Sequence, residues 1–381
     1  MASVAVVGVG MSRFGRYPER SLIDMAVEAV REAIMDAGVK PSQVEACFFA
    51  NALAGRLFGD FTVGQNVFWD TGINRVPVVN VENACTSGST ALYLAFNAVA
   101  AGQAEMAIAV GAEKMYVPEF GLINSGQSEL DTQLGLVAPA SFALRAVRYM
   151  SEFGVTPAQL AQVSVKNRRH ARDNLYAQYR DPVTVEEVLA SPMIVDPLTR
   201  LQCCPIADGA AAVIVCSSSF TKRFKRAVTI DAALLTSGSY ESPQDLIRWE
   251  TDYRTCTSAY EKAGIGPEDL DVVEVHDAFT IAEILHYEAL GLCKAGEGAQ
   301  LVSEGHTGLG GRCPVNVSGG LLSRGHPVGA TGIAQVCEIV TQLRGEGDKR
   351  QVEGAKVGLA HCMGGDKAAD TKSCTVAIFS V

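Results

Sequence analysis

Cys85 is the residue whose surroundings first indicate chemistry. It follows a short segment, residues 76–81, whose β-branched residues predict a buried strand, and it precedes a segment of helical composition, residues 91–101. Between a strand and a helix, unpaired backbone N–H groups and the helix dipole favour a thiolate over a thiol. The position therefore predicts a nucleophilic cysteine, although on this stretch alone a buried apolar cysteine is the more frequent explanation.

Three later stretches carry further reactive side chains. His276 and Asp277 stand at the end of a second apolar strand, and His326 lies in a glycine-rich loop that opens a helix. His361 and Cys362 lie between a strand and a pair of glycines. Glycine-rich loops cost chain entropy, so the loop around His326 predicts a backbone that approaches something closely. Each stretch alone is weak, and a lone histidine is more often a core residue, but together they supply two cysteines and three histidines at loop tips.

Other classes of site fit these residues poorly. A structural zinc site favours ligand pairs such as Cys-x-x-Cys, which the chain lacks, so no metal is expected. A serine hydrolase needs Gly-x-Ser-x-Gly after a strand, and none stands in a suitable place. The early run from Gly8 has Arg13 where a dinucleotide fingerprint needs its third glycine, which argues against a nicotinamide enzyme.

Composition narrows the class of protein further. The chain has 381 residues, 48% of them hydrophobic, and can therefore bury a large core. A net charge of −10 argues against nucleic-acid binding, and no apolar run approaches the length of a membrane span. The first residues lack the basic start of a signal peptide, and eleven scattered cysteines indicate free thiols in a reducing cytoplasm.

A repeat underlies the order of the elements. The helical pattern of residues 21–37 ends at Gly38, and the helix that ends before Gly264 is followed by a similar segment. The paired segments are residues 38–45 with 264–271, 4–7 with 228–232, and 79–81 with 315–317. The repeat predicts two similar halves, each with strands and helices in alternation and a mostly parallel sheet. The helices after Cys85 and Gly329 should meet at the centre.

Domain boundaries follow from this repeat. We expect an N-terminal half at residues 1–226 and a C-terminal half at residues 227–381. The first half carries an insertion at about residues 116–201, with candidate helices at 142–153 and 157–174. Such an insertion typically forms a lid or binding surface over a site.

The chain resembles the thiolase superfamily, and within it the thiolases of the sterol-carrier-protein type. The resemblance covers essentially all 381 residues and rests on four motifs in order: Asn83-Ala-Cys-Thr-Ser-Gly88, Leu201-Gln-Cys-Cys-Pro-Ile-Ala-Asp-Gly209, His276-Asp-Ala-Phe279 and Gly325-His-Pro-Val-Gly-Ala-Thr-Gly332. It implies two βαβαβαββ halves that form a five-layer α-β-α-β-α core with an inserted loop domain. Members of the family are usually dimers.

The resemblance also implies roles for individual residues. Cys85 would accept the acyl group, and His326 would lower its pKa. His276 and His326 would hold the thioester oxygen of the enolate, while the backbone N–H groups of Cys85 and Gly364 would hold the oxygen of the carbonyl that sulfur attacks. Coenzyme A would be a co-substrate, with no bound cofactor, and its contact residues are not identified.

Two positions depart from the sterol-carrier-protein type. Ala278 stands where those thiolases carry an acid/base cysteine after His-Asp, and Cys362 stands where they commonly carry asparagine. The second cysteine is therefore expected at Cys362, as general acid/base. If that assignment failed, His276 or His361 would be the next candidates.

The expected function is a coenzyme A-dependent thiolase that cleaves or forms a 3-oxoacyl-CoA, with a bulky, branched or aromatic acyl group such as benzoylsuccinyl-CoA among the candidates. The alternatives are a thiolase-like retro-aldolase or acyltransferase of steroid or aromatic catabolism, and a non-catalytic subunit. The resemblance suggests a homodimer and, as a further partner, a small zinc-bearing OB-fold subunit.

Overall fold

The computed structural model describes residues 3–120, 129–221, 223–239, 245–367 and 369–381. Residues 121–128 of the expected insertion therefore lie outside the described part of the chain. The long strands join in one nine-stranded sheet, whose order is β3-β2-β4-β7-β1-β8-β11-β10-β9.

The N-terminal half supplies the first five strands of that order. They are β1 (Val4–Met11), β2 (Ala46–Ala50), β3 (Val78–Val81), β4 (Met106–Glu113) and β7 (Gly209–Ser217). β2 pairs in parallel with β3 and β4, whereas β7 is antiparallel to β4 and β1.

The C-terminal half repeats this arrangement with β8 (Val228–Ser237), β9 (Val272–Glu274), β10 (Val357–Lys367) and β11 (Asp370–Ser380). β9 pairs in parallel with β10 and, through a single bridge from Val273, with Val315. β11 is antiparallel to β10 and β8, and β8 joins β1 of the first half. The predicted doubled α/β architecture is confirmed. The prediction of a mostly parallel sheet is wrong, because in each half the strands nearest the junction between the halves run antiparallel to their neighbours.

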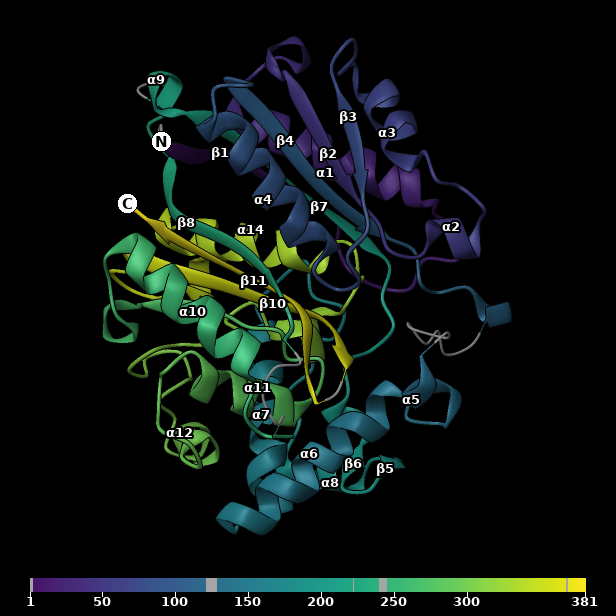
Figure 1. Cartoon of the computed structure of the whole chain (residues 1–381), viewed down its shortest axis with the longest axis vertical. Helices are drawn as coiled ribbons and strands as arrows, with labels where there is room; N and C mark the ends of the chain where they lie inside the picture. Colours follow the sequence, from purple (N-terminus) through teal and green to yellow (C-terminus); the bar gives the residue numbers. More distant parts are fainter. Residues whose placement is uncertain (1–2, 121–128, 222, 240–244, 368) are drawn as a thin grey trace.

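Helices cover this sheet in layers (Figure 1). The helices of the first half are α1 (Leu22–Ala37), α2 (Ala54–Leu57), α3 (Val63–Thr71), α4 (Ser87–Ala100) and α9 (Ser218–Thr221). Those of the second half are α10 (Glu250–Ala263), α11 (Thr280–Ala289), α12 (Gly298–Ser303), α13 (Gly320–Arg324) and α14 (Thr331–Leu343). Short 3₁₀ turns lie at Pro41–Gln43, Pro118–Phe120, Arg200–Gln202, Pro267–Asp269 and Asp348–Arg350.

Three apolar clusters define the layers. One lies between α1, α3 and the outer face of the first half of the sheet, and another lies between the outer face of the second half and α10 with α11. The central cluster contains α4 and α14, between the two halves of the sheet. Alternation along β4 shows why: Ala107 and Ala109 face the central cluster, whereas Ile108 and Val110 face the outer one.

α4 and α14 meet at the centre, as the repeat predicts. A Cβ atom at Gly88 would lie 2.6 Å from the Gly329 carbonyl oxygen, and one at Gly332 would lie 2.6 Å from the Ser89 nitrogen. Only glycine permits this approach, which brings the turn of Cys85 and the loop of His326 together.

The insertion packs against the second half. Its elements are α5 (Leu130–Gln133), α6 (Ala138–Phe153), α7 (Pro157–Ala171), α8 (Val185–Ala190) and the hairpin β5 (Met193–Val195) with β6 (Leu198–Thr199). Figure 1 shows α7 beside α11, and α6 also contacts α11. Lys166 of α7 is buried in an ion pair of 2.8 Å with Glu283 of α11. No helix in the described part of the chain is both long and apolar enough to cross a membrane.

Candidate active site

Cys85 lies in a sharp turn between β3 and α4. Ala84 before it adopts a left-handed conformation (φ 46°), and the backbone N–H groups of Thr86 and Ser87 donate to the carbonyls of Asn83 and Ala84 at 3.1 Å each. A left-handed φ is uncommon for a residue with a side chain and is typical of functional sites. The turn presents the sulfur to a cavity, as its predicted position requires.

The surroundings of Cys85 favour its thiol over its thiolate. Burial raises the pKa of Cys85 to about 12, a hydrogen bond from the backbone of Gly365 lowers it, and the Glu113 carboxylate raises it. Desolvation of the charged form therefore opposes the effect that the helix end has on this thiol. The nucleophile needs a base.

His326 has the geometry of that base. Its Nδ1 lies 2.7 Å from the Thr331 hydroxyl, and this hydroxyl donates its one proton to the Pro327 carbonyl at 3.0 Å. Nδ1 must therefore carry the imidazole proton, which leaves Nε2 as an acceptor. Burial, followed by the charge of Arg324, lowers the pKa of His326 to about 3, so the ring is neutral at ordinary pH.

The structure brings Cys85, His276 and His326 together. The Cys85 sulfur and one nitrogen of each histidine all lie within 4.8 Å of one another. The two rings are 5.0 Å apart and nearly perpendicular, at 84°. Cys85 is thus placed where a neutral imidazole can take its proton while a second imidazole faces the same space. Cysteine and histidine also bind metals, and Asp252, His286 and His361 form a second such group among the described residues.

Cys362 lies next to this cluster. Its sulfur lies 3.3 Å from His276 Nδ1 and 3.2 Å from the Cys85 carbonyl oxygen, so its one proton can be donated to either acceptor. The thiol is buried, and the neighbouring Met363 forms the cavity wall. Burial, together with the nearby Cys85, raises the pKa of Cys362 well above its usual value. His361 points elsewhere: its Nε2 lies 2.6 Å from Asp252, and its ring is fully buried, which removes it as an alternative acid/base in the cavity.

The two glycines after Met363 have different surroundings. A Cβ at Gly364 would lie 2.6 Å from the Thr86 hydroxyl and 2.9 Å from the Asn83 carbonyl oxygen, so β10 packs directly against the Cys85 turn. The backbone of Gly365 supplies the hydrogen bond to the Cys85 sulfur, and Gly365 lines the cavity.

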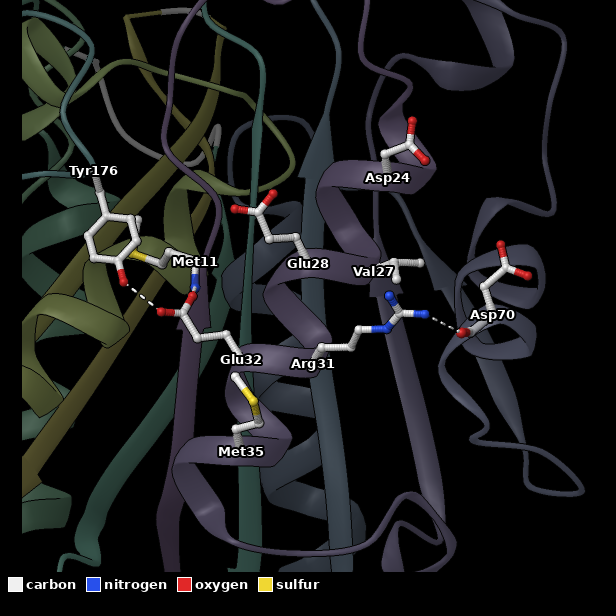
Figure 2. A pocket seen from close by; sticks show the side chains of 9 residues that line it. All are labelled: Met11, Asp24, Val27, Glu28, Arg31, Glu32, Met35, Asp70 and Tyr176. Atoms are coloured by element: carbon white, nitrogen blue, oxygen red, sulfur yellow. Dashed lines mark hydrogen bonds between the residues drawn. The ribbon is translucent and has the colours of Figure 1, made fainter.

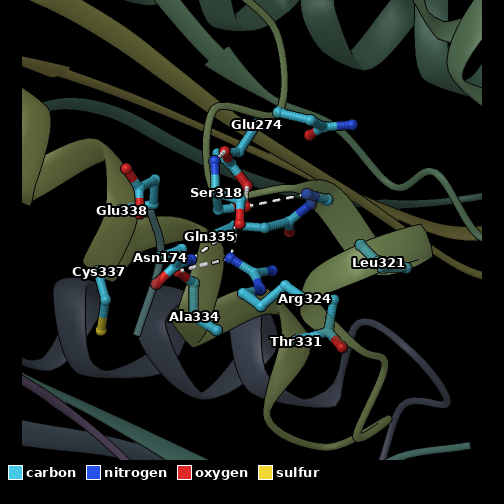
Figure 3. A network of polar contacts seen from close by, with 12 residues as sticks. Asn174, Glu274, Ser318, Leu321, Arg324, Thr331, Ala334, Gln335, Cys337 and Glu338 are labelled. Atoms are coloured by element: carbon cyan, nitrogen blue, oxygen red, sulfur yellow. Dashed lines mark hydrogen bonds and ion pairs between the residues drawn. The ribbon is translucent and has the colours of Figure 1, made fainter. Parts of the chain in front are cut away.

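Buried charges hold the loop that carries His326. Figure 3 shows Arg324 beside Glu274, with Nη1 at 3.5 Å from the carboxylate and 3.2 Å from the Ala334 carbonyl oxygen. The same carboxylate accepts from the Ser318 hydroxyl at 2.6 Å. Asp277, next to His276, accepts from the backbone of Leu321 at 2.7 Å. Such contacts fix the orientation of a functional loop.

The cavity has a volume of about 1180 Å³ and is lined by both halves and the insertion. Phe142 of α6 stacks on Phe279 at 4.4 Å in its wall. Six cations and four carboxylates line it: Arg16, Arg56, Arg145, Arg168, Arg200 and Lys372 with Glu82, Glu129, Asp131 and Asp366. Arg145 and Lys372 pair with Asp366 and Glu129. A large, partly aromatic cavity with an excess of cations suits an acyl group attached to a phosphate-bearing carrier.

A second hollow, of about 790 Å³, lies along α1 (Figure 2). Tyr176 donates to Glu32 there at 2.6 Å, and Arg31 donates to the Asp70 carbonyl at 3.1 Å. None of the predicted catalytic residues is among those that line it.

Some residues of the site were missed in the sequence. Glu113 at the end of β4 is fully buried and accepts from the backbone of Ala52 at 3.0 Å and of Gly329 at 3.1 Å. Burial raises the pKa of Glu113 to about 7. Cys204 lines the cavity, and its N–H donates to the Ala278 carbonyl at 2.8 Å. Thr331 and Cys204 belong to the motifs at residues 325–332 and 201–209, so the sequence offered a signal for both, whereas no local pattern marked Glu113.

Comparisons with known families agree with this geometry. Residues 4–219 match the family described as "Thiolase, N-terminal domain", and residues 233–378 match "Thiolase C-terminal domain-like".

Individual relatives extend over nearly the whole chain. Benzoylsuccinyl-CoA thiolase subunit BbsB of Thauera aromatica is 40% identical, over 95% of this chain and 94% of its own length. Human sterol carrier protein 2 is 40% identical, over 95% of this chain and 70% of its own length. The solved structure of the Ltp2-ChsH2(DUF35) aldolase is similar with a TM-score of 0.83 and 27% identity, over 99% of this chain and 97% of that one. These likenesses confirm the predicted fold and the sterol-carrier-protein type.

Proposed function

Because the chain belongs to the thiolase family, we propose that Cys85 is its acyl-accepting nucleophile and His326 the base that removes the thiol proton. The chain is a coenzyme A-dependent thiolase, an acyltransferase that acts on a 3-oxoacyl-CoA through an acyl-cysteine intermediate. The residue assignments rest on one observation: the Cys85 sulfur and one nitrogen of each of His276 and His326 lie within 4.8 Å of one another.

In the first step the Cys85 proton moves to His326 Nε2 while the sulfur attacks the 3-oxo carbonyl carbon. The oxygen of that carbonyl becomes negative next to the backbone N–H groups of Cys85 and Gly364, the proposed oxyanion hole, with Gly365 beside them. The bond between carbons 2 and 3 then breaks, which leaves an acyl-Cys85 and the enolate of a shorter acyl-CoA.

Both histidines serve the enolate. His326 now carries the proton from Cys85 on Nε2, and His276 donates from the nitrogen opposite Cys362. Two donors aimed at the thioester oxygen stabilise its charge where little water can compete. One residue, His326, thus acts first as base and then as hydrogen-bond donor.

Cys362 is the proposed general acid that protonates carbon 2 and the general base that then deprotonates coenzyme A. Its thiol gives a proton to carbon 2 of the enolate, and the resulting thiolate takes the proton of incoming coenzyme A. The coenzyme A thiolate attacks the acyl group, and Cys85 leaves and recovers its proton from His326. The contact of 3.3 Å between Cys362 and His276 supports a proton that these two groups share.

The substrate that we propose has a bulky, branched or aromatic acyl group, and benzoylsuccinyl-CoA is one example. The support is the cavity of about 1180 Å³ with its stacked Phe142 and Phe279, and the 40% identity to a benzoylsuccinyl-CoA thiolase subunit. Coenzyme A is a co-substrate, its phosphates attracted by the excess of cations in the cavity lining, and the scheme needs no bound cofactor and no metal. The direction of Claisen condensation uses the same groups in reverse.

We also propose a homodimer, a boundary between the halves at residues 226 and 227, and the cytoplasm as location. All eleven cysteines are free, as a reducing compartment requires. A small zinc-bearing OB-fold subunit is the further proposed partner. Its support is that the similar aldolase structure is named together with a DUF35 protein.

A rapid-mixing experiment tests the acyl-enzyme. On mixing with a simple acyl-CoA we expect a burst of about one free coenzyme A per chain, with Cys85 acylated in the mass spectrum. The similar aldolase structure favours a retro-aldolase as second candidate, and this activity would give no burst, since its bond cleavage needs no acyl-enzyme. A non-catalytic subunit would also give none, but it would have no need to keep Cys85, both histidines and Cys362 together.

A further inference from the structure

A second group of titratable residues lies behind the site. Asp252 of α10, His286 of α11 and His361 of β10 are all fully buried. The Asp252 carboxylate accepts from His361 Nε2 at 2.6 Å with one oxygen and from the Thr371 hydroxyl at 2.5 Å with the other. A buried carboxylate with two donors is held rigidly, and it holds them in turn.

His286 lies between the catalytic histidine and the His361 ring. Its Nε2–H donates to the His276 carbonyl oxygen at 3.1 Å, while its Nδ1 lies 3.6 Å from Asp252, beyond hydrogen-bond distance. The ring lies between Trp249, at 4.6 Å, and His361, at 4.3 Å, so it has little freedom to rotate.

His361 connects the same carboxylate to the second cysteine. Cys362 follows His361 directly on β10, and its sulfur reaches His276 Nδ1 at 3.3 Å and the Cys85 carbonyl oxygen at 3.2 Å. Asp252 therefore supports the Cys362 side through its hydrogen bond with His361, and the His276 side through the packing of the His361 ring on His286.

A metal ion is the other use for two histidines and a carboxylate. Two ligands of one tetrahedral zinc ion, each about 2.0–2.1 Å from the metal, lie about 3.3 Å apart. The 2.6 Å between His361 Nε2 and Asp252 is a hydrogen-bond distance and leaves no such space.

We propose that Asp252, His286 and His361 form a positioning unit that aligns His276 and Cys362 with Cys85. The inference rests on the proposed function, because it assigns to the unit the cleavage of the carbon–carbon bond. Acylation of Cys85 by a simple acyl-CoA needs no proton transfer to carbon, and coenzyme A can leave as its thiolate, so the amplitude of the acylation burst should not depend on the unit.

Asp252→Asn is the first test. The amide keeps the size of the side chain but offers one acceptor where two donors, His361 and Thr371, point. We expect kcat for thiolysis of a 3-oxoacyl-CoA to fall at least about tenfold, with KM for coenzyme A and the acylation burst within about threefold of the parent. Thr251→Val is the matched control, because Thr251 is the buried neighbour on the same helix and donates instead to Asp370, at 2.6 Å. Thr251→Val should lower the stability of the protein without lowering kcat for thiolysis relative to the acylation burst.

Two substitutions at His286 distinguish a loss of positioning from a loss of folding. Gln can donate to the His276 carbonyl from the place of Nε2, whereas Leu fills the space without a donor. We expect His286→Gln to keep thiolysis within about fivefold of the parent and His286→Leu to lose it at least about tenfold, at equal burst amplitude. The pair decides the question if Asp252→Asn does not fold.

Three results would overturn the inference. They are parent-like thiolysis in folded Asp252→Asn and His286→Leu, an equal loss of acylation and thiolysis in both, or stoichiometric zinc in the purified parent that Asp252→Asn lacks. A parent without an acylation burst would instead contradict the proposed function, so the two failures remain distinct.

Discussion

Two opposite effects meet at the Cys85 thiol. The start of α4 favours a negative charge, but burial raises the pKa of Cys85 to about 12, and the neutral His326 beside it has its pKa lowered to about 3. A half-buried cysteine with a raised pKa is less open to indiscriminate alkylation and oxidation, since the thiolate is the reactive form. Its reactivity is released only when a substrate carbonyl and the imidazole lie on either side of it.

This arrangement predicts two different pH profiles. Alkylation by iodoacetamide needs the thiolate, so its rate should rise about tenfold per pH unit from about pH 6 to about pH 9, with no plateau. The acylation burst needs a protonated Cys85 and a neutral His326, both present throughout this range, and its rate should stay flat. Stopped-flow and mass-spectrometric labelling measure the two rates. Cys85→Ala should abolish both, and a plateau of alkylation near neutral pH would show that the thiolate is preformed.

Thr331 should control which nitrogen of His326 carries the proton. Thr331→Val removes the acceptor at 2.7 Å from Nδ1, so the proton can move to Nε2, where the ring no longer accepts from Cys85. We expect the burst rate to fall about tenfold to 100-fold, and Thr331→Ser, which keeps the hydroxyl, to restore most of it. Equal burst rates in Thr331→Val and the parent would contradict this role.

Cys362→Ala should separate the two halves of the reaction. Removal of a positioned acid/base typically costs about 10² to 10⁴ in rate, so thiolysis of a 3-oxoacyl-CoA should fall by that order. Acylation by a simple acyl-CoA breaks no carbon–carbon bond and should remain. Turnover and burst amplitude are measured on the same preparation. Thiolysis within a few-fold of the parent would transfer the role to His276, since His361 faces Asp252.

At the scale of elements, the crossing of α4 and α14 positions the site. Both catalytic loops open one of these helices, so their separation is set where Gly88 meets Gly329. Gly88→Ala would place a Cβ 2.6 Å from the Gly329 carbonyl oxygen, which the backbone can relieve only by a shift. We expect a loss of about 1–3 kcal/mol in the free energy of unfolding, measured by urea denaturation, and a lower burst rate.

Gly308→Ala is the control for that substitution. Its nearest neighbour would be 3.4 Å from the new Cβ, an ordinary contact, and its φ is not left-handed. It should change stability by less than about 0.5 kcal/mol. Equal effects of the two substitutions would show that the helix crossing tolerates more separation than the packing indicates.

The same elements show what could be read from the sequence. The end of α1 at Gly38 and the partner strands Val4–Val7 and Val228–Ala232 follow from local patterns that the structure reproduces. Strand direction does not follow from local patterns. Helical connections are visible in a sequence, whereas the antiparallel direction of β7 and β11 is set by long-range pairing. The site divides likewise: motifs located Cys85 and His326, but Asp252 reaches His361 across more than a hundred residues and has no local signature.

At the scale of the whole molecule, the two halves form one continuous sheet. β1 and β8 pair at its middle, and α4 and α14 fill the space between the halves, so neither half completes the cavity alone. The insertion adds the third wall through α6 and is anchored to the β10–β11 hairpin by Lys372, which pairs with Glu129, and by Arg145, which pairs with Asp366 at 2.9 Å. The site is thus a property of the assembled chain.

The outermost strand leads to the last prediction. β3 is at one end of the sheet and pairs only with β2 among the described strands, and Val79 on it is 43% exposed. Trp69 at the end of the neighbouring α3 is 81% exposed. An unpaired edge beside an exposed aromatic residue is unfavourable in water, and a second copy of the chain can cover it by edge-to-edge pairing.

We therefore expect the parent to have twice the 40.3 kDa mass of the chain by light scattering. Val79→Asp adds a charge of the kind that blocks edge pairing, and it should shift the mass toward one chain and weaken association at least about tenfold. Leu175→Asp, at a leucine that is 69% exposed elsewhere, should leave the dimer intact. A parent of single-chain mass, or a Val79→Asp variant that stays dimeric, would place the contact elsewhere or remove it.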